Sequence, residues 1–202
     1  MSHPLPKEYF LRPATELAPD LLGKLLCRKI EDKVIKLRIL ETECYFGEED
    51  TACHAHKGQT PRTDIMYQAG GNAYVYLCYG IHSLLNITTG EAGHPEAVLI
   101  RGVENFIGPG RLTKHLSIDR SLNRMPLVPE HGLWIEDDGT RLDYTTSPRV
   151  GIDYASENDR TRLWRFIAKY SKAVKEKERF LSPFCVKNFY FKKLRFISPN
   201  LS

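Results

Sequence analysis

The stretch VIKLRILETECY, residues 34–45, alternates apolar and polar side chains for most of its length and is typical of a β-strand with one buried face. The stretch KLLCRKI before it, residues 24–30, is also strand-forming, and residues 31–33 (Glu-Asp-Lys) suit a turn. The two stretches predict an antiparallel hairpin. Because side chains alternate across a strand, the inward side is expected to hold Ile35, Leu37, Ile39, Glu41, Glu43 and Tyr45.

Two carboxylates fall on that inward side, because Lys36, Arg38 and Thr42 occupy the other one. Burying a carboxylate is unfavourable unless it is paired, and a buried carboxylate with a shifted pKa is a functional-site candidate. A structural salt bridge at the end of the strand would explain Glu41 and Glu43 equally well. The strand pattern alone leaves both interpretations open.

A second hairpin is predicted by AYVYLCYGIHSLLN, residues 73–86, with its turn at Tyr79-Gly80. This turn places the ring of Tyr79 at the tip of the hairpin, where it is expected to be exposed. An exposed ring at a tip indicates that something flat and apolar meets it.

Four other segments complete the expected fold. Residues 15–25 (TELAPDLLGKL) predict a helix with Thr15 as N-cap and Gly23 as its stop, residues 62–72 a short helix, residues 96–103 a strand, and residues 108–118 a helix. In the last of these, Arg111 and Lys114 stand near the start of the helix. One α+β domain built on an antiparallel sheet is the economical fold prediction.

Composition excludes several classes of protein. The chain has 202 residues, of which 42% are hydrophobic and 27% charged, as in ordinary globular proteins. It has no apolar run long enough to span a bilayer and no signal peptide at its start, so a cytoplasmic protein is expected. Five cysteines without a CxxC pair are expected to be reduced thiols.

Charge is unevenly distributed along the chain. From Arg160 to the end, 12 Lys and Arg face 2 Asp and Glu, whereas residues 1–159 hold 17 basic and 23 acidic side chains. The basic segment suggests an anionic partner such as nucleic acid, although a solvated basic helix over residues 169–180 fits equally well. Its phenylalanines are expected to pack on the domain.

The loop after the predicted strand 34–45 contains further candidate site residues. It follows Tyr45 and carries His54 and His56. Together with Glu41, Glu43 and the tyrosine-rich hairpin, these side chains resemble the lining of a pocket for a planar ring. Cys44 and Cys53 add zinc-ligand types, but the spacing lacks the paired pattern of zinc sites. No metal is predicted.

Five blocks occur in the order of a known family. Residues 40–66 (LETECYFGEEDTACHAHKGQTPRTDIM), 71–89 (GNAYVYLCYGIHSLLNITT), 97–104 (AVLIRGVE), 108–112 (GPGRL) and 148–152 (PRVGI) resemble the alkyladenine (3-methyladenine) DNA glycosylase family. The resemblance runs from about residue 21 to about residue 166. It implies a single α+β domain, with a curved antiparallel sheet, a protruding hairpin and surrounding helices, and without metal or cofactor.

The resemblance also implies an activity. Members flip a damaged purine out of duplex DNA and hydrolyse its N-glycosidic bond, which initiates base excision repair. The implied substrates are 3-methyladenine, 7-methylguanine, hypoxanthine and ethenoadenine. The implied partner is double-stranded DNA with a damaged purine, bound by a monomer away from membranes.

Residue roles follow from matching positions in the blocks. Tyr79 resembles the wedge that fills the gap left by the flipped nucleotide, and Tyr45 and Tyr76 resemble facing walls of the base pocket. His54 resembles a ring that stacks on the base and offers it a hydrogen bond. For Tyr74, core packing is the expectation.

The implied chemistry belongs to three positions. Glu43 resembles the general base that deprotonates the attacking water, Arg101 a side chain beside that water, and the main-chain carbonyl of Val150 a second water contact. Glu41 is expected to be structural. No lysine matches a nucleophile position, so hydrolysis without a Schiff base is expected.

Asn86 matches the asparagine that lies at the C2 edge of the base, where it would exclude the amino group of guanine. Strand alternation places it on the face of His82 and Leu84; the alternative is a hairpin-capping role. Three features depart from the family pattern: Cys44 replaces a small residue, no proline precedes the hairpin glycine, and the tail matches poorly. The domain is expected to span residues 1–202, with a basic aromatic extension from about residue 167.

Two rival classes remain. Glu41 and Glu43 would suit an inverting carbohydrate glycosidase, although Trp134 and Trp164 are the chain's only tryptophans, too few for a sugar platform. A catalytically silent nucleic-acid-binding module would use the basic tail alone. Formation of abasic sites in alkylated DNA separates the glycosylase from the silent module.

Overall fold

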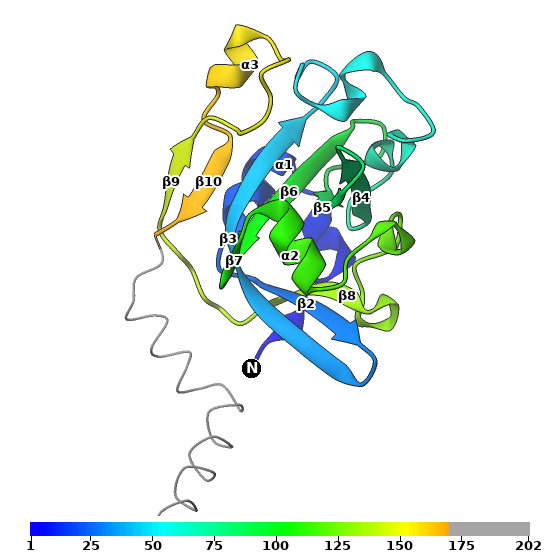
Figure 1. Ribbon diagram of the computed structural model, residues 1–202, viewed down its shortest axis with the longest axis vertical. Coiled ribbons are helices and arrows are strands. Elements are labelled where there is room, and N and C mark those ends of the chain that lie inside the picture. Colours follow the sequence, from blue (N-terminus) through cyan, green and yellow to red (C-terminus); the bar gives the residue numbers. More distant parts are fainter. Residues whose placement is uncertain (170–202) are drawn as a thin grey trace, which may run out of the picture. The chain divides into compact units, whose positions relative to one another are not determined.

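The structure, a computed structural model, describes residues 1–169 (Figure 1). Its strands are β1 (His3–Pro4), β2 (Leu25–Ile30), β3 (Lys33–Phe46), β4 (Ala73–Cys78), β5 (His82–Thr88), β6 (Glu96–Val103), β7 (Phe106–Ile107), β8 (Leu133–Asp137), β9 (Tyr144–Ser147) and β10 (Arg165–Ala168). Its α-helices are α1 (Ala14–Asp20), α2 (Pro109–His115) and α3 (Glu157–Thr161). Single 3₁₀ turns cover Lys7–Leu11, His54–Lys57, Asp64–Tyr67, Arg120–Leu122 and Pro129–His131.

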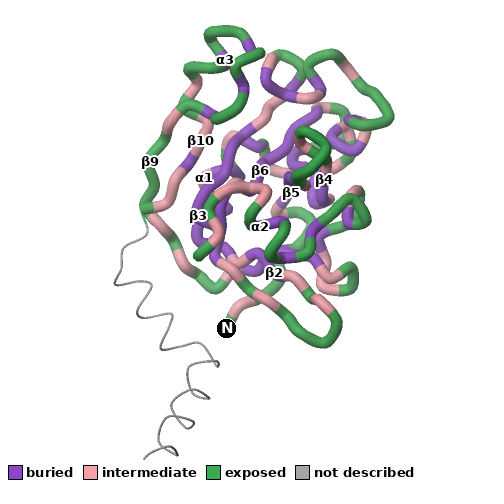
Figure 2. The backbone as a smooth tube through the Cα atoms, in the orientation of Figure 1, coloured by how far each residue is buried: buried purple, intermediate pink, exposed green. Residues whose placement is uncertain are grey.

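The strands form one antiparallel sheet in the order β1-β8-β2-β3-β6-β5-β4, and β10 joins β3 to β9. Few helices accompany it, so the predicted α+β fold on a curved antiparallel sheet is confirmed for the described residues. Figure 2 shows buried residues concentrated along β3, β5 and β6, whereas β9 is largely exposed.

Both predicted hairpins are confirmed. In the first, β2 pairs with the N-terminal half of β3, from Leu25 opposite Arg38 to Ile30 opposite Lys33. In the second, β4 pairs with β5, from Ala73 opposite Ile87 to Cys78 opposite His82. The predicted strand at residues 96–103 is β6.

A β-bulge in β3 overturns one expectation about its faces. The register between β3 and β6 shifts on both sides of Glu41, where β3 leaves β2 and pairs with β6 and β10. Ile39 and Cys44 both belong to the main core although their positions differ in parity. Thr42 donates to the carbonyl of Ala18 on α1.

The prediction that Glu41 and Glu43 share the side of Ile39 is therefore wrong. The extra residue of a bulge reverses which side chains face inward beyond it. The expected burial of both glutamates is confirmed, with Glu41 5% and Glu43 0% exposed, but they are buried on the face opposite α1. Arg38 and Thr42, expected outside, are buried as well.

Two helix predictions need correction. The first helix begins at Ala14 with Pro13 as N-cap residue, so Thr15 is not its cap; Pro13 and Pro19 instead limit it to two turns. In residues 62–72 only the turn Asp64–Tyr67 is helical, because the Gln-Ala-Gly-Gly sequence after it cannot sustain a helix. The helix predicted within residues 108–118 is confirmed as α2.

The α2 helix lies close against the base of the second hairpin. A Cβ atom on Gly110 would lie 3.1 Å from Cγ of His82, a tight contact, so glycine favours this close approach. The hydroxyl of Thr113 donates to the carbonyl of Ser83. These contacts hold the hairpin beside α2, the helix that carries Arg111 and Lys114.

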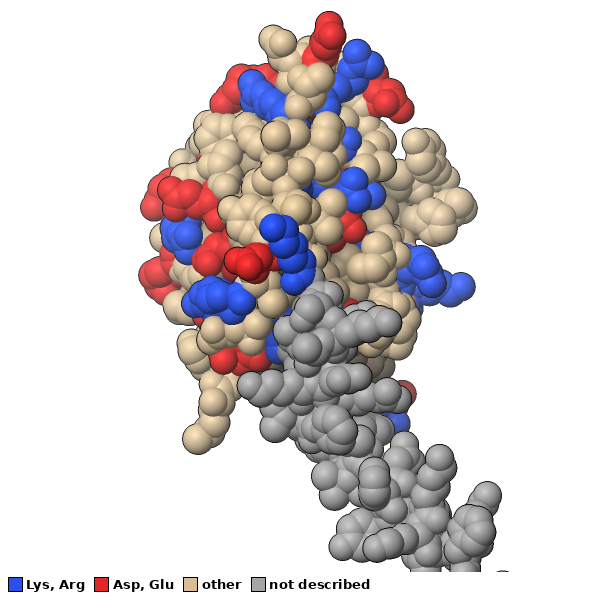
Figure 3. All heavy atoms as spheres, turned by 90° about the vertical axis from the view of Figure 1, so that its left-hand side faces the viewer, with Lys and Arg blue, Asp and Glu red and all other residues tan. Residues whose placement is uncertain are grey.

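Residues 1–169 carry 21 Lys and Arg against 23 Asp and Glu, and the face in Figure 3 shows both signs intermixed. The basic surplus, the expected packing of the tail and the extension from about residue 167 lie outside the described residues, apart from β10. Within the described part, no helix is long and apolar enough to cross a membrane.

Candidate active site

Glu43 lies at the centre of the candidate site, on β3 just beyond the bulge. Its side chain is 0% exposed and accepts hydrogen bonds from the hydroxyl of Tyr45 at 3.0 Å and the backbone amide of Val150 at 2.9 Å. Nη1 of Arg101 lies 3.4 Å from the carboxylate. Burial raises the pKa of Glu43, and the charge of Arg101 and the two donors oppose that rise.

Glu41 has a different environment. One of its oxygens accepts from Nε of Arg101 at 3.0 Å and from Nε of Arg165 at 2.7 Å. Two arginines thus neutralise Glu41, and the first of them also reaches Glu43. This geometry supports the expected structural role of Glu41, as the group that orients Arg101.

A cavity of about 610 Å³ opens beside Glu43. Its size is in the usual range for small-molecule pockets. The predicted site residues that line it are Tyr45, His54, Tyr76, Tyr79, Asn86, Arg101 and Val150. The structure thus brings together the predicted residues from β3, β4, β5, β6 and two loops, with Glu43 directly behind Tyr45, Arg101 and Val150.

His54 and Tyr76 form one aromatic wall. Their ring centroids are 4.6 Å apart at an interplanar angle of 74°. Nε2 of His54 lies 3.4 Å from Nη2 of Arg62, and because a guanidinium only donates, Nε2 is the acceptor. Nδ1 therefore carries the proton and donates to the hydroxyl of Tyr74 at 2.9 Å.

Burial, helped by the charge of Arg62, lowers the pKa of His54 to about 4. The imidazole is therefore neutral at physiological pH. Tyr74 is 2% exposed, as expected of a core residue, but its hydroxyl also holds this imidazole.

Asn86 lines the cavity and also makes a hydrogen bond between the two strands of the hairpin. It is 4% exposed, lines the cavity with His82 and Leu84 as alternation predicts, and lies opposite Tyr74 in the ladder. Its side-chain amide donates to the carbonyl of Tyr74 at 3.2 Å. That bond between strands orients the side chain inside the cavity.

Tyr79 is 90% exposed at the hairpin tip, with a φ of 51°. The left-handed region is unfavourable for a bulky side chain, and such strain concentrates at functional positions. Next to it, Ile81 is 73% exposed. The hairpin therefore presents an apolar tip at the rim of the cavity.

Several lining residues were not predicted. Tyr154, 69% exposed, holds its hydroxyl on the carbonyl of Ala52 at the rim. Arg111 and Lys114 also line the cavity, and their place near a helix start was the available signal. Nothing local to Tyr154 or Arg62 in the sequence indicated a role, because both reach the site through loops.

Val150 makes a contact that was not predicted, because its backbone amide donates to Glu43 at 2.9 Å. Within residues 1–169, no group of three or more His, Cys, Asp or Glu side chains is arranged to hold a metal ion. Of the candidate zinc ligands, His54 bonds Tyr74, and His56 bonds the carbonyl of Glu48 at 2.6 Å.

A buried carboxylate behind an aromatic cavity, with an exposed tyrosine on a hairpin beside it, is the arrangement expected of a base-excising enzyme of the DNA glycosylase class. The family model for Methylpurine-DNA glycosylase (MPG) matches residues 8–107 and 105–172. The chain belongs to this family.

Relatives agree with this assignment. The chain is 45% identical over 179 residues to a protein of Psychrobacter cryohalolentis, covering 74% of this chain and 84% of the relative. It is 43% identical over 180 residues to one of Borreliella afzelii (82% and 96%), and 40% over 193 residues to one of Methanocella arvoryzae (86% and 96%). Each is named "Putative 3-methyladenine DNA glycosylase".

Proposed function

We propose that the chain is a monofunctional glycosylase that flips alkylated or deaminated purines from duplex DNA and hydrolyses their N-glycosidic bond. The proposed substrates are 3-methyladenine, 7-methylguanine, hypoxanthine and ethenoadenine. The observation that carries the proposal is the carboxylate of Glu43, buried directly behind a cavity with aromatic walls. The names of the relatives support 3-methyladenine among these substrates.

In the proposed reaction, the flipped base lies between Tyr45 and the wall of His54 and Tyr76. Aromatic faces favour the positive charge that methylation at N3 or N7 gives a purine. Glu43 takes a proton from a water molecule, which attacks the anomeric carbon as the bond to the base breaks. The base leaves with the bonding electrons, and an abasic sugar remains.

The low pKa of His54 suits its place in the wall beside a cationic base. A neutral imidazole does not repel a cationic base, and its protonated Nδ1 is already committed to Tyr74. Arg101 and Val150 hold Glu43 in place behind the base. The carbonyl of Val150 is proposed as a further water contact.

Lys114 makes the monofunctional assignment testable, because it is exposed and lines the cavity. A lysine nucleophile would form a Schiff base with the sugar and leave a covalent adduct after borohydride reduction. We expect base release from duplexes with hypoxanthine and with 3-methyladenine, and no trapped adduct. A borohydride-trapped complex that is lost in Lys114→Ala would contradict monofunctional hydrolysis.

The structure also bears on the two rivals. An inverting carbohydrate glycosidase needs two carboxylates on opposite sides of one bond, but Glu41 is engaged by two arginines. A silent binding module would bind the same duplexes and leave no abasic sites. Base release is the measurement that decides against it.

The pH dependence of base release has an expected sign. Glu43 acts only when ionised, and burial raises its pKa above the ordinary value of about 4.3 for glutamate. Single-turnover release of hypoxanthine should therefore fall as the pH drops through that raised pKa. A rate that stays constant down to the ordinary glutamate pKa would contradict a general-base role for Glu43.

Asn86→Ser tests the proposed discrimination against guanine. The guanine amino group at C2 would collide with Asn86, whereas hypoxanthine carries only a hydrogen there. The shorter serine should permit slow release of undamaged guanine, with hypoxanthine release largely retained. The measurement is guanine release at enzyme excess over long incubation.

The capping interpretation predicts a different result for the same variant. Loss of the bond to Tyr74 would then lower the melting temperature and slow release from every substrate equally. Absence of guanine release would remove Asn86 as the group that discriminates against guanine.

A further inference from the structure

A fully buried ion pair lies outside the cavity, behind the site. Arg149 and Asp50 both have side chains that are 0% exposed. The guanidinium donates from Nη1 to Oδ2 at 2.6 Å and from Nη2 to Oδ1 at 2.8 Å. A buried pair often adds little net stability compared with apolar packing, so its retention calls for a second reason.

The same guanidinium supports the wall of the cavity formed by Tyr45. Its Cζ lies 4.8 Å from the ring centroid of Tyr45, and Nη1 also donates to the carbonyl of Cys44 at 2.8 Å. Cys44 is the residue between Glu43 and Tyr45. Because Arg149 is buried and Tyr45 lines the cavity, Arg149 backs the ring from the side away from the base.

Arg149 is also connected to Glu43 through the backbone of the next residue. The next residue is Val150, whose amide donates to Glu43 at 2.9 Å. The peptide unit is planar, so the direction of this N–H depends on where Arg149 is held. Asp50, in turn, accepts from the amides of Phe46 and Ala52 and is fixed to the loop after β3.

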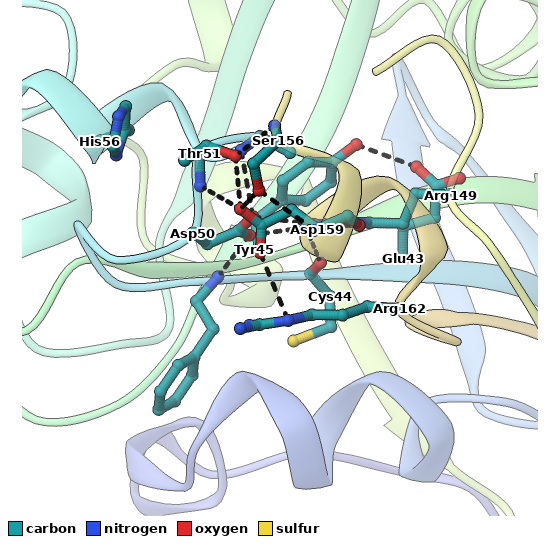
Figure 4. A network of polar contacts seen from close by, with 12 residues as sticks. Glu43, Cys44, Tyr45, Asp50, Thr51, His56, Arg149, Ser156, Asp159 and Arg162 are labelled. Atoms are coloured by element: carbon teal, nitrogen blue, oxygen red, sulfur yellow. Dashed lines mark hydrogen bonds and ion pairs between the residues drawn. The ribbon is translucent and has the colours of Figure 1, made fainter. Parts of the chain in front are cut away.

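A second connection ties the same two segments together. Asp159 accepts from the amide of Thr51 at 3.0 Å and from the hydroxyl of Ser156 at 2.8 Å, and its carbonyl accepts from Nη2 of Arg149 at 3.3 Å. Figure 4 draws Glu43, Tyr45 and these residues in one network of polar contacts. Arg149 is thus the side chain of this network that lies next to Val150 in the chain and contacts the loop after β3 directly.

We propose that Arg149, paired with Asp50, is a positioning residue that holds the Val150 amide and the Tyr45 ring in place and thereby sets the pH at which Glu43 becomes an active base. The inference rests on the proposed function, in which Glu43 is the general base.

The groups that face Glu43 fix the direction of the effect. Arg101 of β6 is the charged partner, Glu41 lies on the same strand, and Arg165 of β10 reaches only Glu41. The Tyr45 hydroxyl and the Val150 amide stabilise the ionised form, and in the proposal Arg149 positions both, through the Tyr45 ring and the peptide bond to Val150. Losing them leaves desolvation less compensated and raises the pKa of Glu43 further.

Arg149→Lys tests the proposal. Lysine retains the charge but cannot make the forked contact with Asp50 and Cys44. The acid limb is the part of the pH–rate profile in which single-turnover hypoxanthine release slows as the pH drops. It should move to higher pH by about one unit, the size expected for a lost hydrogen bond to a charged group. The rate on the high-pH plateau should fall much less than the rate on the limb.

Arg38→Lys is the matched control. Arg38 makes a similar forked contact with Asp138, at 3.2 and 2.9 Å, in the half of β3 that pairs with β2. Its loss should lower the melting temperature without moving the acid limb. A merely structural role for Arg149 predicts the same result for both variants.

Asp50→Asn is the second variant, because it keeps the size and oxygen of the partner and removes the charge. It should move the limb in the same direction, and it decides the question alone if Arg149→Lys does not fold. Folded variants with an unmoved limb, or one moved no further than in Arg38→Lys, would overturn the proposal.

Glu43→Gln separates this inference from the proposed function. If it abolishes the acid limb while Arg149→Lys leaves the limb in place, only the positioning role fails. If Glu43→Gln retains both release and limb, the proposed function itself fails.

Discussion

Replacing Glu43 with glutamine is expected to slow base release by roughly 10²–10⁴-fold, the usual loss on removal of a general base. Glutamine keeps the size of the side chain and one oxygen, which can accept from the Val150 amide, while its NH2 group can donate to the Tyr45 hydroxyl; it cannot take a proton from water. Binding to lesion DNA should therefore survive. Single-turnover release, measured beside binding to the same duplex, checks both expectations.

Glu41→Gln is the matched control, two residues away on the same strand. Glu41 accepts from Arg101 and Arg165 and has a proposed structural role, so its replacement should slow release much less. Equal losses in the two variants would favour a mechanism with two carboxylates. Near-normal release by Glu43→Gln would exclude it as the base.

Stability should change in the opposite direction to activity. Because burial raises the pKa of Glu43, the ionised form destabilises the folded state. This penalty is absent below the ordinary glutamate pKa and grows as the pH rises through the raised one. At neutral pH, Glu43→Gln should melt at or above the wild-type temperature, and the difference should shrink on acidification.

Tyr79→Ala is expected to weaken lesion-specific binding and to slow release by about tenfold or more. Unstacking a base costs a few kcal/mol, of which the inserted ring recovers a part, and 1.4 kcal/mol corresponds to about tenfold. The side chain is 90% exposed, so its removal should leave the melting temperature unchanged. The measurement compares hypoxanthine in a matched pair with hypoxanthine in a mispair.

The loss should be smaller for the mispaired lesion, because a mispaired base is easier to extrude. Tyr79→Phe keeps the ring and should retain most of the activity, which separates the ring from its hydroxyl. Identical losses for paired and mispaired hypoxanthine would argue against a wedge.

Local pattern was sufficient for both hairpins and for the strand β6. Alternation and turn residues predicted β2 with β3, β4 with β5, and the exposed tip at Tyr79. These features depend on residues close in the chain, so a single sequence contains them. The ordered blocks placed the candidate site residues by resemblance, which alternation alone could not do.

The faces of β3 show where local pattern fails. Alternation placed Glu43 beside Ile39, but the bulge at Glu41 moved it to the opposite face. This bulge lies where β3 exchanges its partner β2 for β6 and β10, and β6 and β10 come from distant parts of the chain. Thr15 failed as a cap for a related reason, because Pro13 and the packing of α1 set the helix start.

By itself, the sequence determined the α+β class, the two hairpins and the exposed tyrosine, because each follows from neighbours along the chain. Only the tertiary structure decided which face of β3 buries the two glutamates and which backbone amide bonds Glu43. It also decided that Arg149 and Asp50, 99 residues apart, pair behind Tyr45. Contacts of that kind depend on how segments pack in three dimensions, and no periodicity in the sequence encodes them.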